Sequence, residues 1–278
     1  MVEKVHHGSA QFGTMLREWR GLRQVSQLAL AVDADISQRH LSFLESGRAR
    51  PSREMVLRIA TALDLPLRAR NELLESAGFA AFYPERALSA SELRSASEAL
   101  ERIIAHHEPY PAFILNRHWN IVMTNGAAQR LIARCVSADV VAELSAKTPL
   151  NFMRLTFHPK GIRARVRNWE QIAGVLIARL RREAHGDPGS PSESLLRELA
   201  TPAEKKRSPQ MQDLPLSPAI ALELQTDDGS LRLFNTLTTF GTPQDVTLQE
   251  LRIEMSFPID EASKALLQAW GEAAGTRT

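Results

Sequence analysis

The chain has 278 residues, which is enough for roughly two domains of ordinary size. Because 44% of the residues are hydrophobic and 24% are charged, the composition is that of a globular protein and excludes a largely disordered one. The formal net charge of +2 excludes a global basic field, so a nucleic-acid partner would need a local cluster of positive charge. Apolar runs are too short for a membrane span and do not resemble a signal peptide, so we expect a cytoplasmic protein with no membrane partner.

The first part of the chain is predicted to be an all-α domain of five helices. After a loose tail up to residue 8, Phe12, Leu16 and Trp19 recur at helical spacing. Ser26 and Ser37 are good N-caps for two short helices that are joined by a tight turn. The predicted helices cover residues 9–21, two stretches within residues 26–45, residues 52–63 and residues 66–78, the last of which ends at a glycine.

The second helix of the short pair has one face suited to reading DNA. Leu41 and Leu44 fall on one side of this helix, which should face the core. The other side carries a guanidinium, a hydroxyl and a ring, with an amide beside them: Arg39, Ser42, Phe43 and Gln38. Such groups can meet base edges in a major groove. Between residues 39 and 53, four arginines stand against one glutamate, so this stretch can also neutralise phosphates.

The short helix pair resembles the Xre/phage-repressor class of helix-turn-helix domains. The residues that carry the resemblance are Gln27, Ala31, Ile36, Ser37, Leu41, Leu44-Glu45, Gly47-Arg48 and Pro51-Ser52. The resemblance implies that Arg20 pairs with Glu45. It also implies that the two short helices form a DNA-reading unit rather than a plain piece of helical core. The expected DNA contacts are Gln27, Ser37, Gln38, Arg39, Ser42, Phe43 and Arg48. Asp35 departs from the family, which usually has glycine in the turn, so a left-handed and somewhat strained residue is expected there.

A second, α+β domain is predicted for residues 84–278, after a first domain of residues 1–83. Residues 79–88 are too aromatic for a free linker and are expected to dock one domain on the other. The predicted order is a helix to residue 107, strands at 113–115 and 119–123, a helix capped by Asn125, helices at 151–157, 162–183 and 192–200, three strands and a last helix. The Pro- and Ser-rich residues 186–218, with a solvated charge run at 205–207, should be the least ordered part.

Two features of this second part bear on its surface. The arginines of the helix at 162–183 could form a second nucleic-acid patch, but a solvated helix face is the favoured interpretation because no aromatic residues are interleaved with them. In the last strand, residues 248–257, apolar side chains alternate with Glu250, Arg252, Glu254 and Ser256, which predicts one buried and one polar face.

The second part resembles the MmyB-like ligand-binding domain that follows an Xre-type head in bacterial regulators. The resemblance is carried by LNRHWNIVMTNGAA, FHPKGIRARVRNW and TTFGTPQDVTLQELRIEMSFPID, and it covers most of residues 90–270. It implies a PAS-like fold with a sensory pocket for an apolar, fatty-acid-like ligand. Five aromatic residues could line such a pocket or could equally be ordinary core: Phe113, Trp119, Phe152, Phe157 and Trp169.

The sequence contains none of the common catalytic motifs. A glycine-rich phosphate loop, an HExxH motif and a G-x-S-x-G elbow are all missing, and the histidines are scattered without carboxylates at metal-ligand spacing. The single cysteine, Cys135, excludes an internal disulfide and is expected to be a buried side chain more often than a redox sensor. We therefore expect neither an enzyme nor a cofactor or metal site.

The sequence predicts a sequence-specific DNA-binding transcriptional regulator. We expect a homodimer on two-fold symmetric double-stranded DNA, with a C-terminal domain that senses a small, apolar ligand. The alternative is an antitoxin-like or other DNA-binding protein whose C-terminal domain binds a protein partner. An enzyme with a DNA-binding head is a third interpretation, which turnover of a bound small molecule would support.

Overall fold

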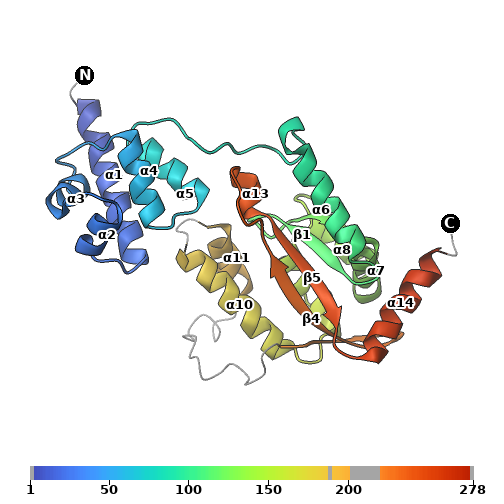
Figure 1. Ribbon diagram of the computed structural model, residues 1–278. Coiled ribbons are helices and arrows are strands. Elements are labelled where there is room, and N and C mark those ends of the chain that lie inside the picture. Colours follow the sequence, from blue (N-terminus) through green and yellow to red (C-terminus); the bar gives the residue numbers. More distant parts are fainter. Residues whose placement is uncertain (1–2, 187–189, 201–219, 276–278) are drawn as a thin grey trace. The chain divides into compact units, whose positions relative to one another are not determined.

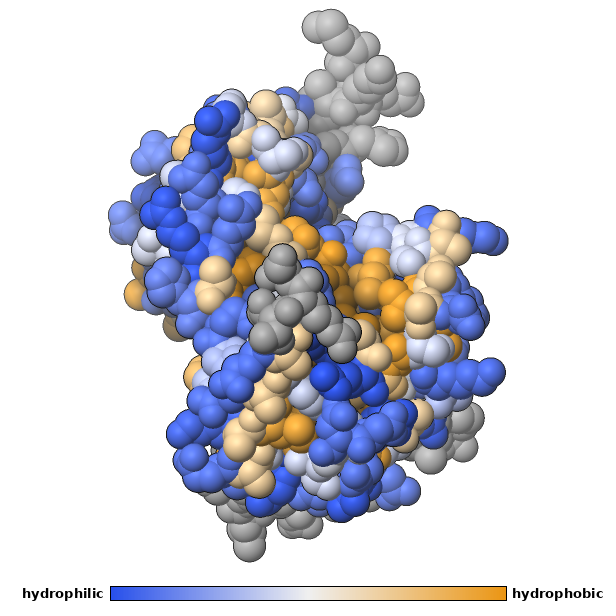
Figure 2. Space-filling view, turned by 90° about the vertical axis from the view of Figure 1, so that its right-hand side faces the viewer, coloured by the Kyte–Doolittle hydropathy of each residue, from blue (hydrophilic) through white to orange (hydrophobic). Residues whose placement is uncertain are grey.

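The computed structural model describes residues 3–186, 190–200 and 220–275. The described residues form two compact units: those up to Arg86 together with residues 241–249, and those of 87–240 together with 250–275 (Figure 1). On the face drawn in Figure 2, hydrophilic residues predominate and hydrophobic residues form patches among them. Within the described ranges, no helix is both long and apolar enough to cross a membrane.

The first unit contains the five predicted helices, which confirms its all-α class. They are α1 Glu3–Leu22, α2 Gln27–Asp33, α3 Gln38–Glu45, α4 Arg53–Ala62 and α5 Leu67–Ser76. Helix α1 begins at Glu3, whereas the sequence pattern placed its start at Ser9. The apolar spacing used for that prediction starts only at Phe12, but no proline interrupts residues 3–8, so the helix can extend beyond its apolar face.

Serine caps set the starts of three of these helices, as the sequence predicted. The hydroxyls of Ser26, Ser37 and Ser52 each accept the amide hydrogen three residues further on, at 3.1 to 3.2 Å. The apolar faces of the helices meet in one core, in which Phe12, Leu16 and Leu41 are completely buried. The caps and this core together fix where α3 begins and which of its sides faces outward.

Helices α1 and α3 approach each other closely at a glycine. A Cβ atom added to Gly13 would lie 2.6 Å from the carbonyl oxygens of both Leu44 and Glu45. Arg17, one turn further along α1, donates a hydrogen bond from Nη2 to the Glu45 carbonyl at 2.7 Å. The C-terminal end of α3 is therefore held directly against the backbone of α1.

The aromatic stretch after α5 packs on α5 itself. The Asn71 side chain accepts the amide hydrogens of Phe82 and Tyr83 at 2.9 and 3.0 Å and donates to the Tyr83 carbonyl at 2.7 Å. The Phe82 ring meets the Tyr83 ring edge to face and lies under the guanidinium of Arg53. These contacts order the stretch within the first unit.

Residues 241–249, which connect strands β4 and β5 of the second unit, complete the first unit. Helix α5 has no side-chain cap from Pro66, and Gln249 supplies one because its Oε1 accepts the Leu67 amide hydrogen at 2.6 Å. The Val246 amide donates to the Pro84 carbonyl at 2.9 Å. Residues 241–249 thus bind both the start of α5 and the stretch that follows the helix.

The second unit is built on a five-stranded antiparallel sheet of order β2-β1-β5-β4-β3, which confirms the α+β class. The strands are β1 Ala112–Leu115, β2 Ile121–Thr124, β3 Leu222–Thr226, β4 Gly229–Thr238 and β5 Arg252–Pro258. Its described helical elements are η1 Ser91–Leu93, α6 Arg94–His106, α7 Gly126–Cys135, α8 Ala138–Ser145, α9 Phe152–Phe157, η2 Ile162–Arg165, α10 Trp169–Gly186, α11 Pro191–Leu199 and α14 Glu261–Gly275 (Figure 1). Helix α13 Val246–Glu250 belongs to the first unit except for its last residue.

Two predicted elements of this unit are wrong in their extent. The helix expected over residues 162–183 is broken into η2 and α10, because Val166 forms a β-bridge with Leu224 and the Arg167 amide donates to Glu223 of strand β3 at 2.8 Å. The strand expected from residue 248 begins at Arg252, because residues 246–250 form α13. The charge run predicted at 205–207 lies outside the described residues.

The polar face predicted for the last strand is not exposed. Glu254 and Ser256 are 5% and 4% exposed, respectively. Strand β5 pairs with β1 on one side and β4 on the other, so it is the central strand of the sheet. A central strand is covered on both faces here, and its alternating pattern places a carboxylate inside the molecule.

Candidate DNA interface and candidate ligand cavity

The outward side of α3 displays most of the predicted DNA-binding residues. Gln38, Arg39 and Arg48 are exposed, and Ser42 and Phe43 are half-buried. The buried side of the same helix carries Leu41 and Leu44, both fully enclosed. The structure therefore brings these five residues to one surface.

Arg39 and Phe43 contact each other on this surface. The Arg39 guanidinium carbon lies 5.4 Å from the centroid of the Phe43 ring. The carbonyl oxygen of Phe43 accepts hydrogen bonds from the amides of Arg48 and Ala49, which close the turn after α3. Sequence reasoning placed both side chains outward but missed their contact, although their i,i+4 spacing puts them side by side on a helix.

Gln27 and Ser37 already have structural partners. The Gln27 side chain donates from Nε2 to Glu45 Oε2 at 3.1 Å, and the Ser37 hydroxyl accepts the His40 amide hydrogen at 3.1 Å. Both residues hold the start of a helix in place. Any DNA contact by these two side chains would have to be made while these hydrogen bonds are kept.

Arg20 and Glu45 form the buried pair that the sequence predicted. Arg20 Nε lies 2.6 Å from Glu45 Oε1 and its Nη2 lies 3.2 Å from Oε2, while Nη1 donates to the Val25 carbonyl. The hydrogen bond to Glu45 raises the pKa of the Arg20 guanidinium above its ordinary value, and burial opposes this less strongly. The Glu45 side chain is only 5% exposed.

Burial of Glu45 leaves a one-sided charge on the surface around α3. Arg39, Arg48, Arg50 and Arg53 are all exposed, and Glu45 was the one acidic residue between them in sequence. The turn between α2 and α3 is shaped by Asp35, whose φ of 51° is the predicted left-handed conformation. The helix pair therefore offers polar groups for bases and a positive rim for phosphates.

A cavity of about 580 Å³ lies between the sheet and helices α9 and α10 of the second unit. Its apolar wall is formed by residues of strands β1, β3 and β4 and of the surrounding helices, among them Phe113, Leu131, Phe152, Ile172, Leu222 and Phe234. Phe113 and Phe152 pack edge to face, with centroids 5.3 Å apart. The size and aromatic lining are those of a small-molecule site.

All five aromatic residues predicted for the ligand site belong to one hydrophobic cluster, but they do not all reach the cavity. Phe113 and Phe152 are on its wall, whereas Trp119, Phe157 and Trp169 do not line it. Trp119, with a φ of 63°, is buried, and the guanidinium carbons of Arg179 and Arg252 lie 4.3 and 4.7 Å from the centroid of its ring.

One end of the cavity is polar, and sequence reasoning missed it. Glu254 on β5 accepts a hydrogen bond at Oε1 from Nδ2 of Asn235 on β4, at 2.9 Å. Arg179 on α10 places Nη1 3.9 Å from Glu254 Oε2. Burial raises the pKa of Glu254 above its ordinary value, and the charge of Arg179 works against this rise. Arg179 therefore does not belong to the solvated helix face that the sequence suggested.

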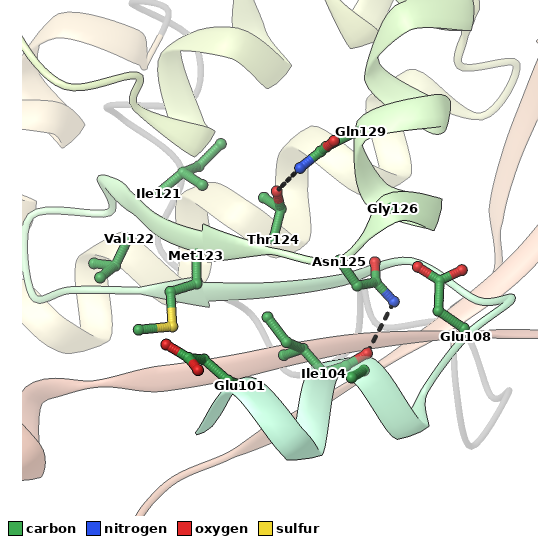
Figure 3. Close-up of a pocket in the computed structure, with 11 residues that line it drawn as sticks. Glu101, Ile104, Glu108, Ile121, Val122, Met123, Thr124, Asn125, Gly126 and Gln129 are labelled. Atoms are coloured by element: carbon green, nitrogen blue, oxygen red, sulfur yellow. Dashed lines mark hydrogen bonds between the residues drawn. The ribbon is translucent and has the colours of Figure 1, made fainter. Parts of the chain in front are cut away.

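A second hollow of about 570 Å³ is an open groove on the outside of the sheet, between α6 and the edge strand β2 (Figure 3). Glu101, Glu108, Val122 and Gln129 line it and are exposed. Asn125 closes its floor by donating to the Ile104 carbonyl at 3.1 Å (Figure 3). Because solvent reaches much of this lining, the cavity at α9 and α10, which is less open, is the better candidate for an apolar ligand.

The described part of the chain contains no cluster of three or more His, Cys, Asp or Glu side chains that could hold a metal ion. Cys135 is buried, as expected, and burial is the main cause that raises the pKa of its thiol to about 11. A thiol in that environment is almost entirely protonated at neutral pH.

A helix-turn-helix with an exposed basic face, followed by an α+β unit with a largely apolar cavity, is the architecture of a ligand-binding type of DNA-binding regulator. Family models agree: residues 15–69 match the helix-turn-helix model, and residues 96–269 match the MmyB-like transcription regulator ligand binding domain. The chain belongs to the MmyB-like transcription regulators. Neither family description names an enzyme.

Solved structures similar to this chain include two bacterial regulators. The restriction-modification controller protein C.AhdI from Aeromonas hydrophila is 32% identical, over 22% of this chain and 94% of that one, with a TM-score of 0.22. The clp gene regulator ClgR from C. glutamicum is 28% identical, over 26% of this chain and 88% of that one, with a TM-score of 0.23. A search of curated proteins found no significant match.

Proposed function

We propose that this regulator binds a two-fold symmetric DNA site as a homodimer, with α3 of each copy in a major groove. The observation that carries the proposal is the outward face of α3, on which Gln38 and Arg39 are exposed while Glu45 is buried with Arg20. One such helix covers only a few base pairs, and pairing two copies supplies the missing specificity. Half-sites about one helical turn apart are expected.

Two kinds of residue should behave differently in DNA binding. Arg39→Ala and Gln38→Ala remove groups that can reach base edges, so each should relax specificity at defined positions by about 1–3 kcal/mol. Arg48→Ala should weaken binding evenly across sequences and reduce the salt slope by about one. Binding to a randomised DNA library at two salt concentrations measures both effects. An unchanged sequence preference for Arg39→Ala would show that α3 is not the recognition helix.

The second part of the proposal is that an apolar, fatty-acid-like molecule binds in the cavity at α9 and α10 and changes DNA affinity. The cavity volume of about 580 Å³ and its aromatic wall support this role. We assign direct contact to Phe113 and Phe152, which line the cavity, with Trp119, Phe157 and Trp169 supporting that wall from the core.

Thermodynamic reciprocity provides the test of this regulation. A ligand that shifts operator affinity by some factor must have its own affinity shifted by operator DNA by the same factor. Fatty acids of increasing length should be titrated into the free protein and into the operator complex. A coupling of about 1–3 kcal/mol is expected. Equal affinities in both titrations for every fatty acid that binds would reduce the second unit to a structural role.

A further inference from the structure

The polar end of the cavity has a donor and an acceptor that no other described residue pairs. Glu254 is 5% exposed, and its Oε2 has no hydrogen-bond partner among the residues that the structure describes. The same holds for Nη2 of Arg179, whose side chain is 18% exposed. The 3.9 Å between Arg179 Nη1 and Glu254 Oε2 is too long for a hydrogen bond. Buried polar atoms are nearly always hydrogen-bonded, so these two atoms can pair with a group that enters the cavity.

Charges of both signs meet at this end. Arg179 and Glu254 line the cavity together with Arg182, which is exposed, and Arg252 and Glu183 adjoin them without lining it. Glu183 Oε1 lies 3.1 Å from Arg252 Nη1 and 3.4 Å from Arg179 Nε, so Arg252 and Arg179 are held by Glu183 as well. The side chains of Arg179, Glu254, Arg252 and Glu183 are at most 21% exposed. A further anion beside Glu254 would be repelled in a poorly solvated site, and it would favour uptake of a proton.

We propose that this end of the cavity selects an uncharged polar head, which donates a hydrogen bond to Glu254 Oε2 and accepts one from Arg179 Nη2. A primary amide or an alcohol meets this requirement as it is, whereas a fatty acid meets it only after taking up a proton from solvent. The inference rests on the proposed function, because it positions the head of the same apolar ligand.

Four ligands of equal chain length separate the possible heads: decanamide, 1-decanol, methyl decanoate and decanoic acid. Isothermal titration calorimetry with the full chain gives each affinity. Methyl decanoate keeps the acceptor but lacks the donor, so it should bind about tenfold or more weakly than decanamide. Equal affinities for all four would overturn the inference.

Proton uptake is the second measurement. Decanoic acid should bind with the uptake of about one proton, seen as a heat that changes between buffers of different ionisation enthalpy, and its affinity should fall by up to about tenfold per pH unit from pH 6 to 8. Decanamide should show neither effect. The decanamide titration also controls for protons exchanged elsewhere in the protein. Decanoic acid binding without proton uptake would contradict the inference.

A substitution connects the effect to Glu254. In Glu254→Gln the repelling charge is gone, so decanoate should bind in its ionised form beside Arg179, without proton uptake and with a flat pH profile. Glu108→Gln, which removes a carboxylate from the outer groove, should retain the proton uptake of the unmodified protein. The head-group series on the unmodified protein decides the matter even if Glu254→Gln does not fold.

The head-group inference and the proposed regulation can fail separately. If decanamide and methyl decanoate bind equally well and both change operator affinity, the regulation is supported and the head-group inference is wrong. If decanamide is preferred as expected but operator affinity does not respond, the head-group inference is supported and the proposed regulation is wrong. If none of the four ligands binds, both are wrong.

Discussion

Replacing Gly13 by alanine should destabilise the first unit and disturb α3. The added Cβ atom would lie 2.6 Å from two carbonyl oxygens at the C-terminal end of α3. These are backbone atoms and cannot swing aside as a flexible side chain could. Relief therefore requires α1 and α3 to separate, which would also stretch the 2.7 Å hydrogen bond from Arg17 to the Glu45 carbonyl.

The expected magnitude follows from three contributions. Overpacking of a close contact typically costs about 1–3 kcal/mol. Weakening the Arg17 hydrogen bond adds about 1 kcal/mol. Alanine in place of glycine inside a helix returns about 1 kcal/mol. The net loss for Gly13→Ala is therefore about 1–3 kcal/mol.

Gly21 in the same helix provides the matched control. A Cβ atom at Gly21 meets nothing within 4 Å, and the residue is exposed. Gly21→Ala should thus have only the helix-propensity effect, a stabilisation of up to about 1 kcal/mol that is reduced near the helix end. Hydrogen exchange of the α2 and α3 amides reports on the first unit alone and avoids assuming that both units unfold together.

Operator affinity is the functional measurement for the same pair of variants. Gly13→Ala should bind operator less tightly because α3 is displaced, whereas Gly21→Ala should bind as the unmodified protein does. If both variants gained stability equally, the close approach of α1 and α3 would not exist in solution, and the positioning of α3 inferred from it would be wrong.

Four further substitutions or treatments test other parts of the structure. Arg20→Ala leaves Glu45 buried without its partner and should cost about 3 kcal/mol in unfolding free energy, part of which Glu45→Leu in the same chain should restore; equal losses in both variants would argue against a buried charge. Phe43→Ala should reduce DNA affinity without lowering the melting temperature if the ring contacts a thymine methyl, and a lowered melting temperature would instead indicate packing. Asp35→Ala should destabilise by about 1 kcal/mol and Asp35→Gly should not, as thermal unfolding can show, because only glycine accepts a φ of 51° freely. Cys135, with its pKa raised to about 11, should react with iodoacetamide at pH 8 far more slowly in the folded than in the denatured chain; equal rates would show that the thiol is accessible.

Local signals in the sequence predicted the elements whose ends are set by local hydrogen bonds. Asn125 was expected to cap a helix, and its Oδ1 does accept the Ala128 amide hydrogen at 2.9 Å. Asp228-Gly229 is a residue pair typical of hairpin turns, and β4 begins at Gly229 directly opposite Thr226 of β3. The outward residues of α3 were found for the same reason, since helical periodicity alone decides which side chains face away from the core.

Sequence reasoning failed where distant segments decide the outcome. The break between η2 and α10 arises because Val166 and Arg167 pair with strand β3. The sequence of residues 162–183 contains no signal from which this pairing could be predicted. The polar end of the cavity was missed because Glu254 and Arg179 each fit a solvated face in their own segment. Their burial depends on the position of β5 in the centre of the sheet, which periodicity within one strand does not reveal.

The assignment of residues 241–249 to the first unit limits how modular this protein is. The chain passes from one unit to the other at residues 86–87, 240–241 and 249–250, rather than through a single linker. A fragment ending at Arg86 would lack the Gln249 side chain that caps α5 and the Asp245 carboxylate that pairs with Arg86 at 3.1 Å. A chimera that exchanged only residues 1–86 for another head would leave Val246 and Gln249 without the groups they bind. The DNA-reading part is thus interrupted in sequence, and a clean exchange has to include both of its pieces.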